Sequence, residues 1–315
     1  MKLSVIIVTH NSASVLGACW RSVHSSMPSA EIIVVDNAST DDTQRLCEEL
    51  DGVKLIANLV NGGYGRACNQ GIAAASGSHV LFLNPDVQVS EVDLGALQLA
   101  GDAAPFGLVA PMLKHGTHAI SRWPVDLIRH VAGPLRPREL PALPKLAPRR
   151  GRWWPAGALL LVDRQEFLGI GGFDRRFFLY YEDLDLTRRY RAAGLPVRIT
   201  RSVRALHRQG TSSADHRSAA AVRQGWSYLS WIEYLCTWYG PDTAQRAAGY
   251  AHALRTHLNR TLELLERAGP LSRRAARKRL ELAEIETFVS WQSSFQPGTA
   301  AEDFCPRARE IIAAL

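Results

Sequence analysis

The stretches that decide the fold are LSVIIVTHNS (residues 3–12) and EIIVVDNASTDDT (residues 31–43). Each is an apolar, β-branched run that ends in polar side chains suited to turns and helix caps, so we predict strands over Leu3–Val8 and Glu31–Val35. A helical stretch separates the two runs. Strands that alternate with helices in this way indicate βαβ units and a mostly parallel sheet.

The same alternation continues as far as residue 83. We predict strands over Val53–Ala57 and His79–Leu83, with helices over Asp42–Leu50 and Tyr64–Ala75 between the strands. Ligands of such sheets bind outside the carboxyl ends of the strands, and we expect three polar clusters at those ends to converge on one crevice. The clusters are Thr9–Asn11, Asp36–Asn37 and Asn84–Asp86.

The pattern changes twice along the rest of the chain. Residues 112–152 are rich in Pro, Arg and His, and we expect an irregular excursion on the acceptor side of the site. Order returns with the apolar stretch Gly157–Val162, and a helix is predicted over Asp183–Ala193 that ends at a glycine. The composition then becomes helical, so we predict a catalytic domain over residues 1–215 and a helical region over residues 216–315.

Composition limits the classes of protein that this chain can be. Its 315 residues carry a net charge of +7, which suits anionic ligands, and we expect no nucleic-acid partner. The five cysteines are odd in number and lack metal-ligand spacing, which argues against disulfides and favours the cytoplasm. The apolar run at the N-terminus is too short for a signal peptide. Peripheral contact with the inner face of the cell membrane stays open.

Five segments of the chain occur together in one order: SVIIVTHNS, EIIVVDNASTDDT, NGGYGRACNQGIAAASG, LFLNPDV and FFLYYEDLDLTRRYRAAG. In this combination, residues 1–215 resemble family 2 glycosyltransferases of the GT-A fold, particularly the bacterial rhamnosyltransferase-like branch. The resemblance implies an α/β, Rossmann-like, mostly parallel sheet flanked by helices, followed here by a C-terminal helical appendage. It also implies inverting transfer of a sugar from a nucleotide-sugar donor to a hydroxyl of a cell-surface polysaccharide or lipid-linked glycan. The donor that we expect is dTDP-L-rhamnose, with UDP- and GDP-sugars as alternatives.

The resemblance assigns the nucleotide-sugar site to the first strand ends. Asp36 would accept a hydrogen bond from the pyrimidine imide, although it could instead cap the following helix, a role that Ser39 and Thr40 could also fill. Thr9 and Asn11 would line the same pocket, and a plain strand-to-helix turn explains them almost as well. The other candidates for this site are Asn37, Gly63, Arg66, Asn69, Asn84 and Pro85.

The resemblance makes Asp86 a ligand of a divalent metal, Mg²⁺ or Mn²⁺. These ions prefer oxygen ligands and take one or two carboxylates together with substrate phosphates. The family pattern usually has Asp where this chain has Asn84, which leaves one carboxylate and predicts modest metal affinity. A β-turn with Pro85 at its second position fits the same residues. His207 would contact the metal or the diphosphate.

The acidic pair Glu182-Asp183 is the candidate for the catalytic base. A carboxylate must take the proton of the acceptor hydroxyl, and the resemblance assigns that role to Asp183, with Glu182 as the second choice. Favourable interaction of acidic side chains with a helix N-terminus explains the same pair without catalysis. Trp153 and Trp154 could form the acceptor-side wall or belong to an ordinary core.

Other functions and further partners stay open. A nucleotidyltransferase would carry a glycine-rich, basic signature after the first strand, and none follows Leu3–Val8. An inactive glycan-binding protein would have lost the carboxylates, but Asp36, Asp86 and Asp183 are present. Leucines and basic residues interleave over Arg255–Arg279. This stretch could pack on the catalytic domain, form a homodimer, or bind anionic lipid.

Overall fold

The computed structural model describes residues 2–90, 95, 97, 105–111, 120–122, 153–200, 206–207, 217–268, 279, 283 and 303–313. The chain forms two compact units. The first, here the sheet unit, comprises residues 1–121, 154–175 and 182–214. The second, here the helical unit, comprises residues 122–153, 176–181 and 215–315. The short segment 176–181 therefore belongs with the C-terminal helices, although the residues on both sides of it belong to the sheet unit.

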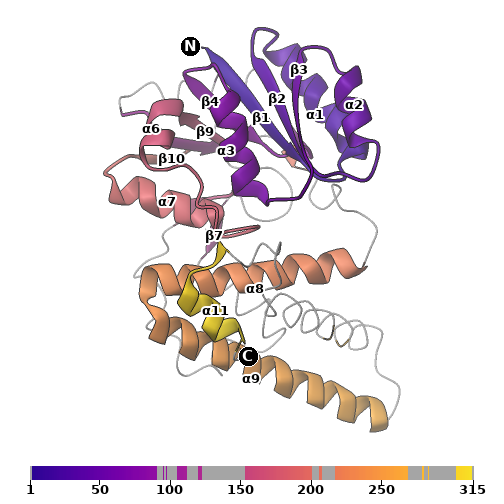
Figure 1. Ribbon diagram of the computed structural model, residues 1–315, viewed down its shortest axis with the longest axis vertical. Helices are drawn as coiled ribbons and strands as arrows, with labels where there is room; N and C mark the ends of the chain where they lie inside the picture. The colour runs from indigo at the N-terminus through magenta and orange to yellow at the C-terminus, as the bar shows by residue number, and fades with distance from the viewer. Residues whose placement is uncertain are drawn as a thin grey trace. The chain divides into compact units, whose positions relative to one another are not determined.

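One seven-stranded sheet organises the sheet unit (Figure 1). Its order is β10–β6–β9–β4–β1–β2–β3. The strands are β1 (Leu3–Thr9), β2 (Glu31–Asn37), β3 (Val53–Asn58), β4 (His79–Leu83), β6 (Leu108–Pro111), β9 (Leu159–Asp163) and β10 (Val197–Thr200). The first four are parallel, as are β6 and β10, while β9 runs antiparallel to both of its neighbours. The prediction of an α/β, mostly parallel sheet is confirmed.

Helices cover both faces of this sheet. The helices are α1 (Ala13–Ser26), α2 (Thr43–Glu49), α3 (Tyr64–Ala74), α6 (Arg164–Gly169) and α7 (Glu182–Ala192). Successive strand residues point to opposite faces, so Val5 and Ile7 pack with α1 and α2, whereas Ile6 packs with α3, α6 and α7. Burial on both faces explains why the strands are continuous apolar runs rather than alternating ones.

Two short ladders complete the strands that the structure describes. The backbone of β5 (Val87–Gln88) pairs antiparallel with β11 (Leu206–His207), and β7 (Ile120–Arg122) pairs with β8 (Trp153–Pro155). Apart from β7, the excursion predicted for residues 112–152 lies outside the described residues.

The helical unit has a core of its own, built from α8 (Arg217–Tyr239), α9 (Pro241–Ala268) and α11 (Pro306–Ala313). Gly240, at a φ of 87°, makes the turn between the first two helices, a conformation that favours glycine. Aromatic and small residues share the core, including Trp226, Phe304 and Ala248. None of the helices in the described part of the chain is both long and apolar enough to cross a membrane.

Most predicted elements match the structure within one or two residues. The strand predicted over His79–Leu83 has those bounds, and α7 ends before Gly194, whose φ of 73° is that of a glycine cap. The helix predicted to begin at Asp183 begins one residue earlier, at Glu182. Both carboxylates of the acidic pair therefore lie in the first turn of α7.

Candidate active site

Three neighbouring strands bring the predicted polar clusters to one edge of the sheet. The backbone register pairs Thr9 with Asp36 across β1 and β2, and Ile7 with Leu83 across β1 and β4. Since these strands are parallel, the turn at residues 84–86 leaves the sheet at the same edge as Thr9 and Asp36. The expected convergence of the three clusters is therefore what the topology produces.

Asp36 is fully buried, and protein groups satisfy its carboxylate. Oδ1 accepts hydrogen bonds from the hydroxyls of Thr9 (2.8 Å) and Ser39 (2.5 Å). Oδ2 accepts from the Ser39 N–H (3.0 Å) and from Nε2 of Gln44 (2.7 Å). This carboxylate thus braces the turn after β2. The N-cap residue of α2 is Asp42, whose side chain makes no capping hydrogen bond, and the preceding Asp41 accepts the N–H of Thr43 at 3.1 Å. Neither Ser39 nor Thr40 caps this helix.

The turns after β1 and β2 hold each other in place. Asn11, at a φ of 52°, accepts the Thr40 N–H on its side-chain oxygen at 2.8 Å and donates its own N–H to the Ser39 hydroxyl at 2.8 Å. Ala38 also has a positive φ, of 56°. Non-glycine residues in this conformation are strained and persist where the surrounding contacts impose it, a feature that concentrates at ligand sites.

The glycine-rich turn before α3 joins the same edge. Asn37 donates from its side-chain nitrogen to the carbonyl of Gly63 at 3.1 Å. Gly63 itself has a φ of 89° and precedes the first residue of α3, where backbone N–H groups can face an anionic ligand. Arg66 lies in the first turn of this helix and is half-buried. The roles of Gly63 and Arg66 in binding the donor stay predictions.

Asn69 serves a packing role in this structure. Its amide nitrogen donates to the carbonyl of Phe173 (2.8 Å), and its amide oxygen accepts the Phe173 N–H (2.9 Å). A Cβ on Gly172 would lie 2.6 Å from that oxygen, so the turn at residues 171–173 must carry glycine there. Both ends of the amide are used in fastening this turn to α3, and a role for Asn69 in nucleotide binding stays a prediction.

The acidic pair reaches the same edge through the backbone of Gly157 and Ala158. Asp183 accepts the N–H of Gly157 on Oδ2 (3.0 Å), and the carbonyl of Gly157 accepts the hydroxyl of Tyr64 (2.8 Å). The next carbonyl, that of Ala158, accepts the N–H of Asn84 (2.9 Å). Through Gly157 and Ala158, the acidic pair, the start of α3 and the turn at residues 84–86 are thus joined. The sequence carries no signal that singles out Gly157 or Tyr64 for this role.

Burial changes the proton affinity of both carboxyls. It raises the pKa of Asp183 to about 6, partly opposed by hydrogen bonds from the N–H groups of Gly157 and Leu184. Burial, and then the charge of Asp183, raise the pKa of Glu182 well above its ordinary value. Oε2 of Glu182 receives no hydrogen bond from any residue that the structure describes. Both carboxyls therefore bind a proton more tightly than a carboxyl in water does, and the titrations of the two are linked.

Asp86 lies in a turn that the structure confirms. The N–H of Val87 donates to the carbonyl of Asn84 at 3.1 Å, so Pro85 occupies the second position of a β-turn and Asp86 the third. The side chain of Asp86 is 5% exposed. The ladder of β5 and β11 places the backbone of His207 opposite that of Val87, which brings the two metal-ligand candidates into one neighbourhood.

The donor set fits a cation that substrate phosphates help to hold. Asp86 supplies a hard carboxylate oxygen, the kind of ligand that Mg²⁺ and Mn²⁺ prefer. Among the residues that the structure describes, no group of three or more His, Cys, Asp or Glu side chains could form a metal cage. The side chains of His207, Trp153 and Trp154 lie outside the described residues, although the backbone of each belongs to a strand.

Residues 4–181 match the glycosyl transferase family 2. The N-acetylglucosaminyl-diphospho-decaprenol L-rhamnosyltransferase of Mycobacterium tuberculosis is 30% identical over 279 residues, which are 80% of this chain and 88% of that protein. Rhamnosyltransferase WbbL of Escherichia coli is 24% identical over 248 residues, 73% of this chain and 91% of that protein.

Solved structures share the fold at lower identity. The mannosyltransferase PcManGT of Pyrobaculum calidifontis, in complex with GDP-Man and Mn²⁺, aligns with a TM-score of 0.51 at 16% identity, covering 95% of this chain and 88% of that one. Glucosyl-3-phosphoglycerate synthase of Mycobacterium tuberculosis, in complex with UDP, glucosyl-3-phosphoglycerate and Mn²⁺, aligns with a TM-score of 0.52 at 18% identity, covering 73% of this chain and 78% of that one. These likenesses concern the fold.

Proposed function

This chain belongs to glycosyl transferase family 2, and we propose that it moves L-rhamnose from dTDP-L-rhamnose onto a hydroxyl of a lipid-linked glycan or cell-surface polysaccharide. The observation that carries this proposal is the hydrogen bond of 3.0 Å between Asp183 and Gly157, next to the peptide that binds the turn of Asp86. It brings a basic carboxylate to the strand edge where Asp36 and the glycine-rich turn lie. The relatives named as rhamnosyltransferases support the choice of donor.

The reaction is a single displacement with inversion at the anomeric carbon. The acceptor oxygen attacks that carbon from the face opposite the diphosphate, and the bond between the carbon and the diphosphate oxygen breaks. Asp183 takes the hydroxyl proton as the new bond forms. Its carboxylate accepts two backbone N–H groups, from Gly157 and Leu184, and has lone pairs left for a proton. Burial raises the pKa of Glu182 and so favours its uncharged form beside the base.

Residues at the strand ends hold the donor in this proposal. Asp36 and Thr9 lie against the base, while Gly63 and Arg66 face the diphosphate. Asp86, with His207, would hold a divalent cation, Mg²⁺ or Mn²⁺, which when bound supplies positive charge to the departing diphosphate. The residues of this machinery belong to the part of the chain for which we propose a catalytic domain, residues 1–215.

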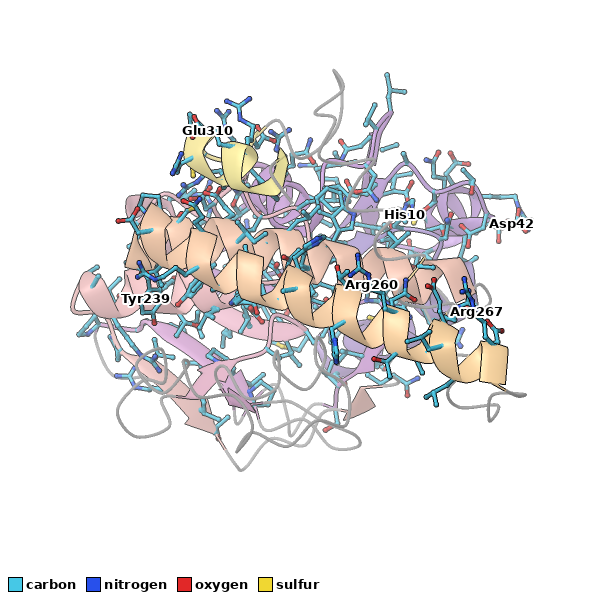
Figure 2. The ribbon with its side chains drawn as sticks, turned by 90° about the horizontal axis from the view of Figure 1, so that it is seen from below. His10, Asp42, Tyr239, Arg260, Arg267 and Glu310 are labelled. Carbon is cyan, nitrogen blue, oxygen red and sulfur yellow. The ribbon has the colours of Figure 1, made fainter. Side chains whose placement is uncertain are left out.

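The acceptor proposal rests on the decaprenol-linked substrate in the name of the mycobacterial relative. An acceptor of this kind lies in a membrane, so we include peripheral contact at its inner face. Arg260 and Arg267 project from α9 and are exposed (Figure 2). They could face anionic headgroups. A homodimer through the C-terminal helices is the alternative use of this surface.

A donor scan tests the proposal. The purified full chain is incubated with dTDP-L-rhamnose, UDP-glucose or GDP-mannose and a polyprenyl-diphosphate-linked N-acetylglucosamine, with Mn²⁺ or with EDTA. We expect a rhamnosylated product from the first donor, and only with Mn²⁺. NMR should show that the anomeric configuration of rhamnose in the product is opposite to that in the donor. If another donor gives the product, that donor replaces dTDP-L-rhamnose in the proposal. Synthesis of a nucleotide sugar from a nucleoside triphosphate and a sugar phosphate would indicate a nucleotidyltransferase, and binding without turnover an inactive protein.

A further inference from the structure

One face of α8 contacts the segment of residues 176–181. Five of its residues contact that segment or its partners, and their spacing of three and four places them on one side of the helix. They are Trp226, Ser230, Glu233, Tyr234 and Thr237. The segment that they contact leads without interruption into Glu182 and Asp183, the first residues of α7.

Glu233 is the centre of this face. Its side chain is fully buried, which is costly for a carboxylate unless partners satisfy it. Oε1 accepts hydrogen bonds from Nη1 of Arg176 (2.7 Å) and from the hydroxyl of Thr237 (3.1 Å), and Oε2 accepts the N–H of Cys305 (2.9 Å). One side chain thus joins the start of the segment, α8 and the residue that precedes α11.

The rest of the face holds the backbone and rings of the segment. The hydroxyl of Ser230 donates to the carbonyl of Leu179 at 2.9 Å. The rings of Phe178 and Trp226 stack with centroids 4.2 Å apart, and the rings of Tyr181 and Tyr234 lie 5.5 Å apart. The segment is therefore fastened along its whole length, at Arg176, Phe178, Leu179 and Tyr181.

The backbone that these contacts hold is strained. Tyr180 and Tyr181 both have a φ of 68°, and two consecutive bulky residues in the left-handed region are unusual. Such conformations persist where surrounding contacts over-determine them, and they concentrate at active sites. The strained pair directly precedes Glu182, the first residue of α7.

We propose that Glu233, through its ion pair with Arg176, is a positioning residue for the catalytic base. The face of α8 holds residues 176–181 in the strained conformation from which Asp183 follows, so a helix without recognisable motifs takes part in the chemistry. This inference rests on the proposed function, in which Asp183 is the base. Loss of the ion pair lets Tyr180 and Tyr181 relax and moves Asp183 away from the acceptor hydroxyl, while the donor site stays intact.

The test compares Glu233→Gln with matched variants. Glutamine keeps the shape of the side chain but has no charge and only one acceptor oxygen. It therefore cannot accept hydrogen bonds from both Arg176 and the N–H of Cys305. Since misplacement of a reacting group by about 1 Å can cost about 10²-fold, we expect kcat to fall by roughly 10- to 100-fold, with the donor KM within about twofold of wild type. Glu310→Gln, an exposed glutamate of the same unit, is the control and keeps wild-type kcat.

A double variant separates positioning from loss of structure. In an Asp183→Asn background, Glu233→Gln should lower kcat by no further factor, because both changes act through one carboxylate. Arg176→Lys should keep more activity than Arg176→Ala. If Glu233→Gln does not fold, as judged by circular dichroism at the assay temperature, Ser230→Ala replaces it, with a smaller fall in kcat expected at unchanged KM.

Each other result counts against the inference. A folded Glu233→Gln enzyme with wild-type kcat, or a fall in kcat that multiplies with that of Asp183→Asn, overturns the positioning role. Loss of donor affinity in step with kcat does the same, since it indicates general disruption. If Asp183→Asn itself keeps full activity, the proposed base is wrong, and the failure lies with the proposed function.

Discussion

The two units of this protein bury carboxylates in opposite ways. In the helical unit, Glu233 accepts three hydrogen bonds, from residues as far as 72 positions away in the sequence. In the sheet unit, Glu182 is almost as buried but has an oxygen that receives no hydrogen bond from the described residues. Burial raises the pKa of both carboxyls, that of Glu233 to about 7 and that of Glu182 well above its ordinary value. The difference lies in their hydrogen bonds: Glu233 fastens backbone through three partners, whereas Glu182 keeps an oxygen without one and lies beside the proposed base. Substitutions of carboxylates in the sheet unit should therefore lower turnover more than substitutions in the helical unit.

The largest effect is expected at Asp86. Asp86→Ala removes the carboxylate proposed to hold the cation, so transfer should fall below detection and donor binding in Mn²⁺ should weaken, with the fold unchanged by circular dichroism. The control is Asp42→Ala, an acidic residue whose ion pair with Arg45 is exposed to solvent. An active Asp86→Ala enzyme, or full wild-type activity in EDTA, contradicts the metal site.

Asp183→Asn should have the next largest effect. Asparagine nearly keeps the shape but cannot take a proton, so turnover should fall by roughly 10²–10⁴-fold while donor binding, measured by calorimetry, survives. In wild type the base must be ionised, and its pKa is raised to about 6. kcat/KM should therefore decline as the pH falls through about 6, and this decline should be absent in Asp183→Asn. A larger loss of turnover in Glu182→Gln would make Glu182 the base.

Glu182 also allows a smaller test, of stability. Burial and the neighbouring Asp183 raise its pKa, so between its ordinary value of about 4.3 and the raised value the native state binds more protons than the unfolded state. The free energy of unfolding must then decrease as the pH rises through this window. Glu182→Gln removes the buried charge. At pH 8 we expect the free energy of unfolding of this variant to exceed that of wild type by about 1–3 kcal/mol.

Thermal melts between pH 5 and pH 8 measure this difference, which should shrink towards pH 5, where wild-type Glu182 is protonated. Glu310→Gln, at an exposed glutamate, should show no such trend with pH. A Glu182→Gln variant less stable than wild type at every pH would mean that the ionised carboxylate is stabilised in the fold, and that the comparison with Glu233 is mistaken.

The smallest effect concerns α9 and membrane contact. Arg260→Glu with Arg267→Glu should weaken sedimentation with anionic vesicles at low salt, by on the order of 1 kcal/mol for each basic residue that faces the lipid, and should leave transfer to a water-soluble acceptor unchanged. The neighbouring candidates Arg273, Arg274 and Arg277 lie outside the described residues. Wild-type protein that does not sediment at low salt leaves helix packing or dimerisation as the role of this face.

Local sequence was a good guide where one segment carries its own signal. The run His79–Leu83 predicts β4 with the observed bounds, and Gly194 ends α7 as a glycine cap should. Local sequence was a poorer guide to the hydrogen-bond partner of each polar side chain. Thr40 was a possible cap for α2, yet the helix begins after Asp42, Asp41 accepts the first helical N–H, and the N–H of Thr40 donates to Asn11. Asp and Thr side chains can all accept a backbone N–H, so neighbouring turns decide among them.

The sequence by itself determined the α/β class, because apolar periodicity and turn residues act over a few positions and can be read locally. The five segments that occur in one order carried the resemblance to the family. The sequence also determined which polar clusters meet, since parallel strands place their carboxyl ends at one edge of a sheet. Only the tertiary structure decided that β9 enters the sheet antiparallel, that Gly157 binds Asp183, and that Glu233 reaches Arg176. The two hydrogen bonds join residues 26 and 57 positions apart, and they form because buried polar groups must find partners wherever the packed chain brings them.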